Sequence, residues 1–254
     1  SEEFAMTDTL LDVQNVTHEF SLSKTACVRA LDRLSFSIRR GEIYGLVGES
    51  GSGKSTAARC VMNLVQPLAG QIFYQGIDIT NPRQFAANKK LLQTSRQMIF
   101  QDSTSSLNGR MKVADIIDFF SDFYRDFDRV KATEMLNTLN LSSLSRLKAL
   151  SKGNREKVQL ILTMSRRAQL YILDEPIAGV DPAARDYILN TILANYSEDA
   201  SVLLSTHLIA DIERVLDEVV FLKEGSMVLH EGVDTIREEH GKSVDMLFRE
   251  VFSC

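Results

Sequence analysis

The sequence predicts an α/β fold with a mainly parallel sheet, preceded by an antiparallel β unit and interrupted by an inserted helical block. Residues 43–47 and 170–173 are short apolar runs, which are typical of buried strands in a parallel sheet. Residues 34–38 alternate between apolar and polar side chains, as a half-exposed antiparallel strand does. From residue 113 to about 167 every strong periodic signal is helical. A chain of 254 residues with 44% hydrophobic side chains can bury a core, as one large domain or two small ones.

The segment at residues 48–55 (GESGSGKS) fits the phosphate-loop pattern G-x-x-x-x-G-K-[ST] at every specified position. Its glycines let backbone N–H groups approach phosphate oxygens, where a Cβ would collide. Lys54 can reach the β- and γ-phosphates, and the Ser55 hydroxyl is placed to ligate Mg²⁺. An apolar strand precedes the segment, and a helix predicted at 54–65 points its positive dipole end at the same anion. The order of strand, loop and helix favours the core of a P-loop nucleoside triphosphatase over a glycine-rich turn with a chance lysine.

The other elements are predicted in chain order from periodicity and turn residues. Strands are expected at residues 10–20, as a pair within 70–80, at 97–101 and 202–205, and as a hairpin of 219–222 with 227–229. Helices are expected at 114–123, 129–139, 154–166, 182–196 and 207–216, and in the tail at 234–254. Asn81 and Pro82 indicate a further helix start, because proline suits the first helical position.

Composition excludes several classes of function. The net charge of −5 and the pI near 5.5 argue against nucleic-acid binding. No run approaches the length of about 18 apolar residues that a membrane-spanning helix needs. Residues 1–5 are interpreted as an expression-tag remnant, and no signal peptide is expected. Cys27, Cys60 and Cys254 have no C-x-x-C spacing, which fits a reducing cytoplasm and no cysteine metal site.

Two adjacent carboxylates, Asp174 and Glu175, end the apolar run at 170–173. In a phosphate-loop enzyme the Mg²⁺-directed aspartate follows a neighbouring strand at this place. Adjacent residues at a strand end point in different directions, so Asp174 can address the metal while Glu175 faces the γ-phosphate and the attacking water as general base. The alternative is a solvated acidic turn before Pro176.

The chain resembles a nucleotide-binding domain of an ATP-binding cassette (ABC) transporter over about residues 10–232. The resemblance rests on motifs that occur in the family's order. They are the phosphate loop, Gln101, LSKGN at 150–154, LDEP at 173–176, GVDP at 179–182 and STH at 205–207.

The resemblance implies a role for each matching residue. Glu175, His207 and Lys54 would be catalytic, and Ser55, Gln101 and Asp174 would hold Mg²⁺. Nucleotide contacts would come from Phe20, Gly48, Ser50, Gly51, Ser52, Gly53, Lys54, Ser55, Thr56, Gln101, Ser151, Gly153 and Asp181. Phe20 would stack on adenine, although it could instead be a core residue of its strand. Ser151 and Gly153 would contact the γ-phosphate of a nucleotide held by the opposite protomer.

Two features depart from the family pattern. Lys152 and Asn154 stand where the signature usually has glycine and glutamine. The front half resembles oligopeptide-importer cassettes, whereas the back half resembles bacterial export or resistance cassettes, so the direction of transport stays open at this stage.

The resemblance implies an ATP-binding and ATP-hydrolysing subunit that dimerises around two MgATP and drives a separate transmembrane permease. The dimer could be a homodimer or a heterodimer, and the subunit would lie peripherally on the cytoplasmic face of the cell membrane. Residues 1–9 would be a tail, 10–232 the ATPase domain with a helical subdomain at about 103–167, and 233–254 a C-terminal helical tail. The alternatives are a soluble cassette ATPase with a non-membrane partner and a poorly hydrolysing regulatory module.

Overall fold

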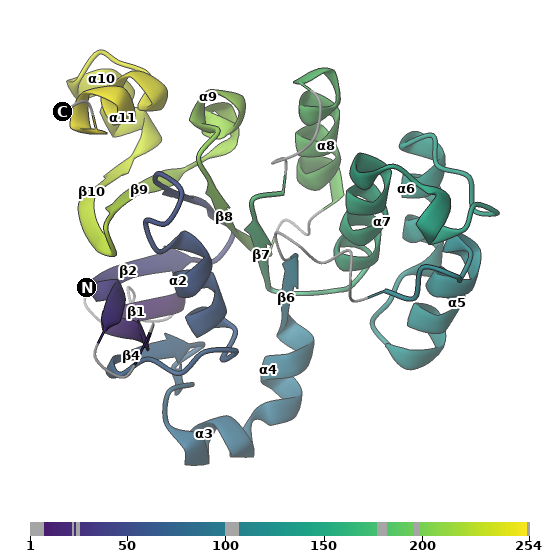
Figure 1. Cartoon of the computed structure of the whole chain (residues 1–254), viewed down its shortest axis with the longest axis horizontal. Helices are drawn as coiled ribbons and strands as arrows, with labels where there is room; N and C mark the ends of the chain where they lie inside the picture. Colours follow the sequence, from purple (N-terminus) through teal and green to yellow (C-terminus); the bar gives the residue numbers. More distant parts are fainter. Residues whose placement is uncertain are drawn as a thin grey trace.

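The computed structural model describes residues 8–21, 23, 26–99, 107–176, 182–195 and 199–252. Six strands form the central sheet, in the order β10-β9-β3-β8-β7-β6 (Figure 1). Their bounds are Ile43–Val47 for β3, Arg96–Ile99 for β6, Leu170–Asp174 for β7, Ser201–Thr206 for β8, Glu218–Lys223 for β9 and Ser226–Gly232 for β10. All pairs are parallel except β10 with β9, which confirms the predicted hairpin and the mainly parallel sheet. Every residue of β3 and β7 is buried, which explains their uninterrupted apolar runs.

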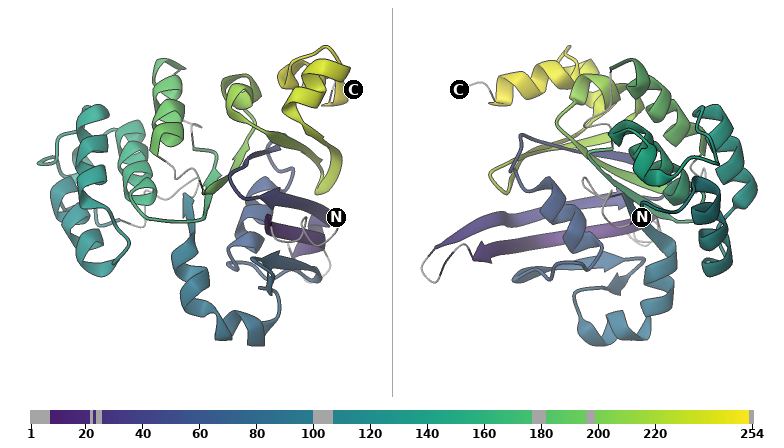
Figure 2. Two further views of the ribbon diagram at one scale, coloured as in Figure 1. Left: turned by 180° about the vertical axis from the view of Figure 1, so that it is seen from behind. Right: turned by 45° about the vertical axis from the view of Figure 1, so that its right-hand side comes forward.

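A second, antiparallel sheet has the order β2-β1-β4-β5. Its strands are Thr9–Ser21 for β1, Cys27–Arg39 for β2, Ala69–Tyr74 for β4 and Ile77–Asp78 for β5. The long β1 and β2 strands project to one side in the right-hand view of Figure 2. The predicted range 34–38 covers only the last part of β2. The alternation of apolar and polar residues is interrupted before Leu34, because Arg33 has a left-handed φ of 49° and the pairing of β2 with β1 shifts its register there. The antiparallel β unit itself is confirmed.

The helix after the phosphate loop, α2 (Lys54–Val61), ends four residues before the predicted boundary at 65. Asn63 adopts a left-handed φ of 57°, which terminates the helix. The buried Arg96 guanidinium caps this end, since its Nη1 donates to the Val61 carbonyl at 2.5 Å and to Asn63 Oδ1 at 3.1 Å. Burial lowers the pKa of Arg96 to about 10. A residue 35 positions away in sequence therefore holds the end of the helix that follows the phosphate loop.

Replacing Arg96 with alanine is expected to lower the free energy of unfolding by about 2–4 kcal/mol, because the substitution leaves the buried Val61 carbonyl without its donor. Urea denaturation followed by circular dichroism measures the change. Arg129→Ala is the matched control, since Arg129 makes an exposed ion pair with Asp118 and its loss should stay below about 1 kcal/mol. Equal effects of the two substitutions would contradict the capping role of Arg96.

The remaining helices are α3 (Pro82–Ala87), α4 (Lys89–Ser95), α5 (Val113–Phe123), α6 (Arg129–Thr138), α7 (Lys152–Met164), α8 (Pro182–Asn195), α9 (Ile209–Ile212), α10 (Val233–Glu239) and α11 (Val244–Phe252), with short 3₁₀ turns at Leu147–Ala149 and Glu213–Val215. The predicted start at Asn81 and Pro82 is confirmed, because Asn81 Oδ1 accepts from the first-turn backbone N–H groups of α3. The single helix predicted at 207–216 was wrong. The segment begins at Ile209 and tightens into a 3₁₀ turn from Glu213.

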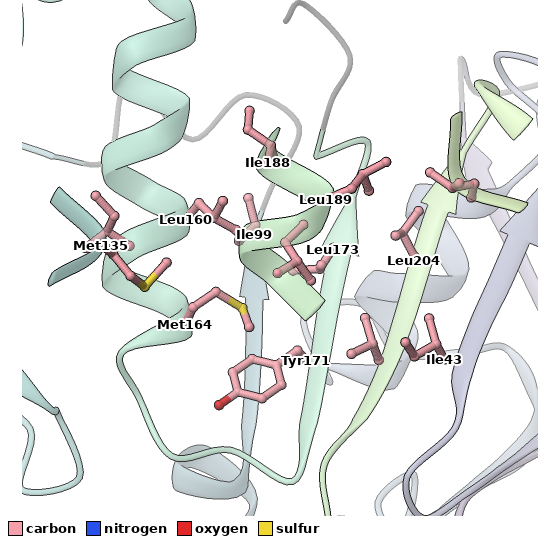
Figure 3. Packing of buried hydrophobic residues seen from close by; sticks show 14 of the residues in the cluster. Ile43, Ile99, Met135, Leu160, Met164, Tyr171, Leu173, Ile188, Leu189 and Leu204 are labelled. Atoms are coloured by element: carbon pink, nitrogen blue, oxygen red, sulfur yellow. The ribbon is translucent and has the colours of Figure 1, made fainter. Parts of the chain in front are cut away.

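The parallel sheet separates two hydrophobic cores. One lies between this sheet, α2 and the antiparallel sheet, and includes Tyr44 and Leu46. The other lies on the opposite face, where Ile99 and Leu173 lie against Leu160 of α7 and Leu189 of α8 (Figure 3). This core extends along the sheet to Ile43 on β3. Helices α5, α6 and α7 gather at one side of the molecule in Figures 1 and 2. Within the described segments no helix has the length and apolar character needed to cross a bilayer.

Candidate functional site

Three parallel strands end at the same edge of the sheet and bring the sequence motifs together. Val47 at the end of β3 pairs with Thr206 of β8, and Asp174 at the end of β7 pairs with Ser205. Residues that follow parallel strands in register emerge side by side at the carboxyl edge of the sheet. The phosphate loop, the acidic pair and His207 therefore meet at one place.

The phosphate loop is packed so tightly that two of its glycines have no room for a side chain. A Cβ on Gly48 would lie 2.3 Å from the carbonyl oxygen of Leu222 on β9. A Cβ on Gly53 would lie 2.4 Å from the carbonyl oxygen of Ala30 on β2, and Gly53 also has a φ of 108°. The loop is thus held between the two sheets, with the N-terminus of α2 opening toward the site.

Lys54 is buried and folds back onto its own loop. Its Nζ donates to the carbonyls of Gly48 and Glu49, both at 2.8 Å, and lies 3.7 Å from Glu175 Oε1. Burial lowers the pKa of Lys54, and the charge of Glu175 opposes this shift. An ammonium group that water solvates poorly attracts an incoming phosphate more strongly than an exposed one does.

Asp174 has the arrangement of a cation ligand. Its Oδ1 accepts from Ser55 Oγ at 3.0 Å and from Ser205 Oγ at 2.5 Å, whereas its Oδ2 is buried without a hydrogen-bond partner. A buried carboxylate oxygen without a partner is costly, and a hard divalent cation is the ligand that suits it. The buried charges here are one positive charge, on Lys54, and two negative charges, on Asp174 and Glu175. A bound triphosphate would add further negative charge, which a cation would neutralise. The donor set fits Mg²⁺.

Glu175 points its carboxylate at His207. The His207 Nδ1 lies 3.0 Å from each carboxylate oxygen, and Thr206 Oγ donates to Oε2 at 3.2 Å. Glu175 has a left-handed φ of 52°, which is uncommon for a residue with a side chain. Residues with such a backbone conformation are often found at functional sites. Because an ionised carboxylate only accepts hydrogen bonds, the contact is a hydrogen bond in the tautomer that places the ring hydrogen on Nδ1.

A cavity of about 400 Å³ lies between these groups. Its lining residues are Glu49, Ser50, Gly51, Lys54, Ser55, Glu175, His207 and Phe248. Phe248 belongs to α11 and was missed from the sequence. The available signal was the aromatic pair Phe248 and Phe252, which share one face of the helix at a spacing of four residues.

Other predicted contact residues lie away from the cavity. Asp174 lies beneath Ser55, and Thr56 is buried in α2. The Ser52 hydroxyl is buried beside Gly48. Phe20 is 39% exposed on β1, opposite Val28, with its ring edge-on to His18.

Ser151 and Gly153 begin α7, which lies on the far side of β7 from α2 (Figure 1). Neither residue lines the cavity. Gln101 and Asp181 fall outside the described residues.

A larger hollow of about 660 Å³ lies at the opposite edge of the sheet, where Tyr171 and Arg166 line it. Arg166 is already paired there with Asp126 at 2.7 Å. This hollow contains none of the motif residues, so the functional site is the smaller cavity at the phosphate loop.

A parallel sheet with a phosphate loop after β3 and an acidic pair after β7 defines a P-loop nucleoside triphosphatase. The profile of the ABC transporter family matches residues 31–178. The chain belongs to the ABC transporter family, of which it is an ATP-binding cassette. The predicted fold class, family and enzyme class are confirmed.

Individual relatives agree with this assignment. The chain is 32% identical over 231 residues to the putative oligopeptide transport ATP-binding protein YkfD of Bacillus subtilis, covering 86% of this chain and 69% of the relative. It is 32% identical over 230 residues to the oligopeptide transport ATP-binding protein OppF of Streptococcus mutans, covering 86% and 73%.

Among solved structures, an ATP-binding subunit of an ABC transporter matches with a TM-score of 0.78 and 26% identity, over 95% of this chain and 99% of that one. The cassette MJ0796, solved as a dimer with ADP and Pi, is 20% identical with a TM-score of 0.74 over 87% and 98% and supports the fold.

Proposed function

We propose that this chain hydrolyses MgATP as the motor subunit of a transporter, paired with a second cassette and coupled to a separate membrane permease. The observation that carries the proposal is the convergence of Lys54, Glu175 and His207 on one cavity, with Asp174 hydrogen-bonded to Ser55 of the cavity wall. The relatives named above are transport proteins, which favours this function over a soluble cassette with a non-membrane partner.

The residues divide the hydrolytic work among them. Lys54 and the N-terminal N–H groups of α2 bind the phosphates. Glu175 accepts a proton from the attacking water as the water oxygen bonds to the γ-phosphorus and the bond to the bridging oxygen of ADP breaks. His207 holds the Glu175 carboxylate in place. Bound Mg²⁺, held by Ser55 and Asp174 with Gln101 as a further predicted ligand, would neutralise charge on the phosphate oxygens.

A second copy of a cassette would complete the site. Ser151 and Gly153 are predicted to contact the γ-phosphate, yet they lie away from the cavity of their own chain. Ser151 caps α7 by accepting from Asn154 N at 3.2 Å, and the space around the Gly153 Cα is open. This helix N-terminus is free to approach an anion held by another protomer. Lys152 pairs with Glu156 at 4.0 Å along the same helix, which favours a solvated side chain over a phosphate ligand.

The permease would dock on the helical side. Phe119 and Phe123 of α5 are exposed by 55% and 67%, and their rings stack with centroids 5.9 Å apart. Exposed stacked aromatics are typical of a protein interface. We infer peripheral attachment to the cytoplasmic face of the membrane through this contact, and we keep residues 103–167 as the helical subdomain that provides it.

Mixing two inactive variants tests whether the site is shared between protomers. Lys54→Met removes a phosphate contact, and Gly153→Asp places a carboxylate toward the partner's γ-phosphate in a position where a side chain has room. Each variant alone should hydrolyse little ATP, whereas an equal mixture should recover roughly a quarter of the wild-type rate, because half of the dimers contain one intact site of two. Phosphate release measures the rate. Full activity of Gly153→Asp alone would show that one chain forms the whole site, and no gain on mixing would contradict a site shared between two copies of this chain.

A further inference from the structure

The C-terminal helix contributes to the wall of the phosphate cavity. Among the cavity-lining residues that the structure describes, Phe248 of α11 is the one with an apolar side chain. It lines the same cavity as Lys54 and Glu175, which are expected to act on the γ-phosphate. An aromatic ring cannot bind phosphate as Lys54 does, so its presence here requires another explanation.

Phe248 is held in this position by two other rings. It stacks on Phe252 with centroids 4.1 Å apart and meets Phe221 edge-on at 5.3 Å. Phe221 is fully buried on β9 and pairs with Val47, the residue directly before the phosphate loop. The next residue of β9, Leu222, provides the carbonyl against which Gly48 packs. The aromatic cluster is therefore attached to the strand that supports the loop.

Helix α11 also contacts the segment that follows His207. The backbone N–H of Asp245 donates to Glu213 Oε2 at 3.1 Å, and Glu213 begins the 3₁₀ turn after α9. Val244 and Leu247 are buried in the core on the same side of the sheet. Helix α11 thus contacts both β9, which supports the phosphate loop, and the 3₁₀ turn that follows His207 and α9.

We propose that α11 is part of the nucleotide site, with the Phe248 ring packing against the phosphate end of bound ATP and excluding bulk water from the side near His207. This inference rests on the proposed function. A low-dielectric wall strengthens the attraction between Lys54 and the phosphates. The ring edge carries positive partial charge and so tolerates an adjacent anion. Nucleotide binding and docking of α11 consequently stabilise each other.

The chain contains no tryptophan, which allows a direct optical test. Phe248→Trp introduces one reporter in the cavity wall, and Met246→Trp introduces one on the exposed side of the same helix. The magnesium complex of the non-hydrolysable analogue AMP-PNP should change the emission of Phe248→Trp in a saturable manner and leave that of Met246→Trp unchanged. No change at position 248 under saturating analogue would overturn the inference.

Truncation provides the second measurement. Phe248→Ala should weaken AMP-PNP binding about five- to tenfold in calorimetry, whereas Phe248→Leu should recover most of the affinity. Phe252→Ala is the matched control, because it removes the other ring of the stack but does not line the cavity. If Phe248→Ala and Phe252→Ala lowered the affinity for AMP-PNP equally, Phe248 would have only a structural role. If the unmodified chain bound no AMP-PNP, the proposed function itself would fail, whereas normal binding with a silent reporter would refute this inference alone.

Discussion

Glu175→Gln is expected to bind MgATP and stay dimeric while hydrolysis slows by roughly 10²–10⁴-fold, the usual contribution of a positioned general base. Glutamine keeps the size of the side chain and can still accept a hydrogen bond from Thr206, but it cannot take a proton from water. The nucleotide that joins the two protomers would then persist. Single-turnover hydrolysis and size-exclusion chromatography with MgATP measure the two effects.

Glu49→Gln is the control for this substitution. Glu49 lines the same cavity, but its side chain is exposed, and only its backbone carbonyl meets Lys54. The control should change the rate by less than about threefold, because the Glu49 carboxylate is exposed to water and has no assigned part in the proton transfer. A Glu175→Gln protein that hydrolysed ATP at the rate of this control, or that remained monomeric at saturating MgATP, would remove Glu175 from the reaction.

Asp174→Asn is expected to abolish magnesium-dependent binding without destabilising the ligand-free protein. The wild-type carboxylate has one buried oxygen that lacks a partner, and a neutral amide is less costly to bury than an ionised group. With the wild type, MgATP at 100 times its dissociation constant adds about 2.7 kcal/mol of stability, which corresponds to a rise in Tm of very roughly 5–10 °C. The variant should lose this rise.

Thermal unfolding with MgATP, and with ATP plus EDTA, separates the metal from the nucleotide. The wild type should show the full rise only with magnesium, and Asp174→Asn should show the same small rise in both conditions. A variant that kept the full magnesium-dependent rise would indicate that Asp174 does not hold the cation. A ligand-free variant that unfolded well below the wild type would instead assign Asp174 Oδ2 a structural partner.

Several predictions succeeded because their signals are local. The strand at 43–47 was predicted from its apolar run, and the start of α3 was predicted from Asn81 and Pro82. Both signals influence only the neighbouring residues of the chain. The parallel register then placed Asp174 beside Ser205 without any further sequence signal. The roles assigned to individual site residues stay predictions until the variants above are measured.

The errors arose where distant contacts override local pattern. Helix α2 ends early where Asn63 takes a left-handed φ, and the distant Arg96 guanidinium holds this end. The segment 207–216 divides where the chain tightens into a 3₁₀ turn at Glu213. Strand β2 is longer than its alternation suggests because it pairs along its whole length with β1.

The sequence by itself determined the family and located the phosphate-loop and acidic motifs, because these depend on residue types at fixed short spacings. Only the tertiary structure decided that Lys54 is bonded to its own loop, that one oxygen of Asp174 is buried without a partner, and that Phe248 reaches the cavity. It also placed Ser151 and Gly153 away from the cavity of their own chain. These features join residues that are distant in sequence, and packing of the whole chain, not local preference, sets such distances.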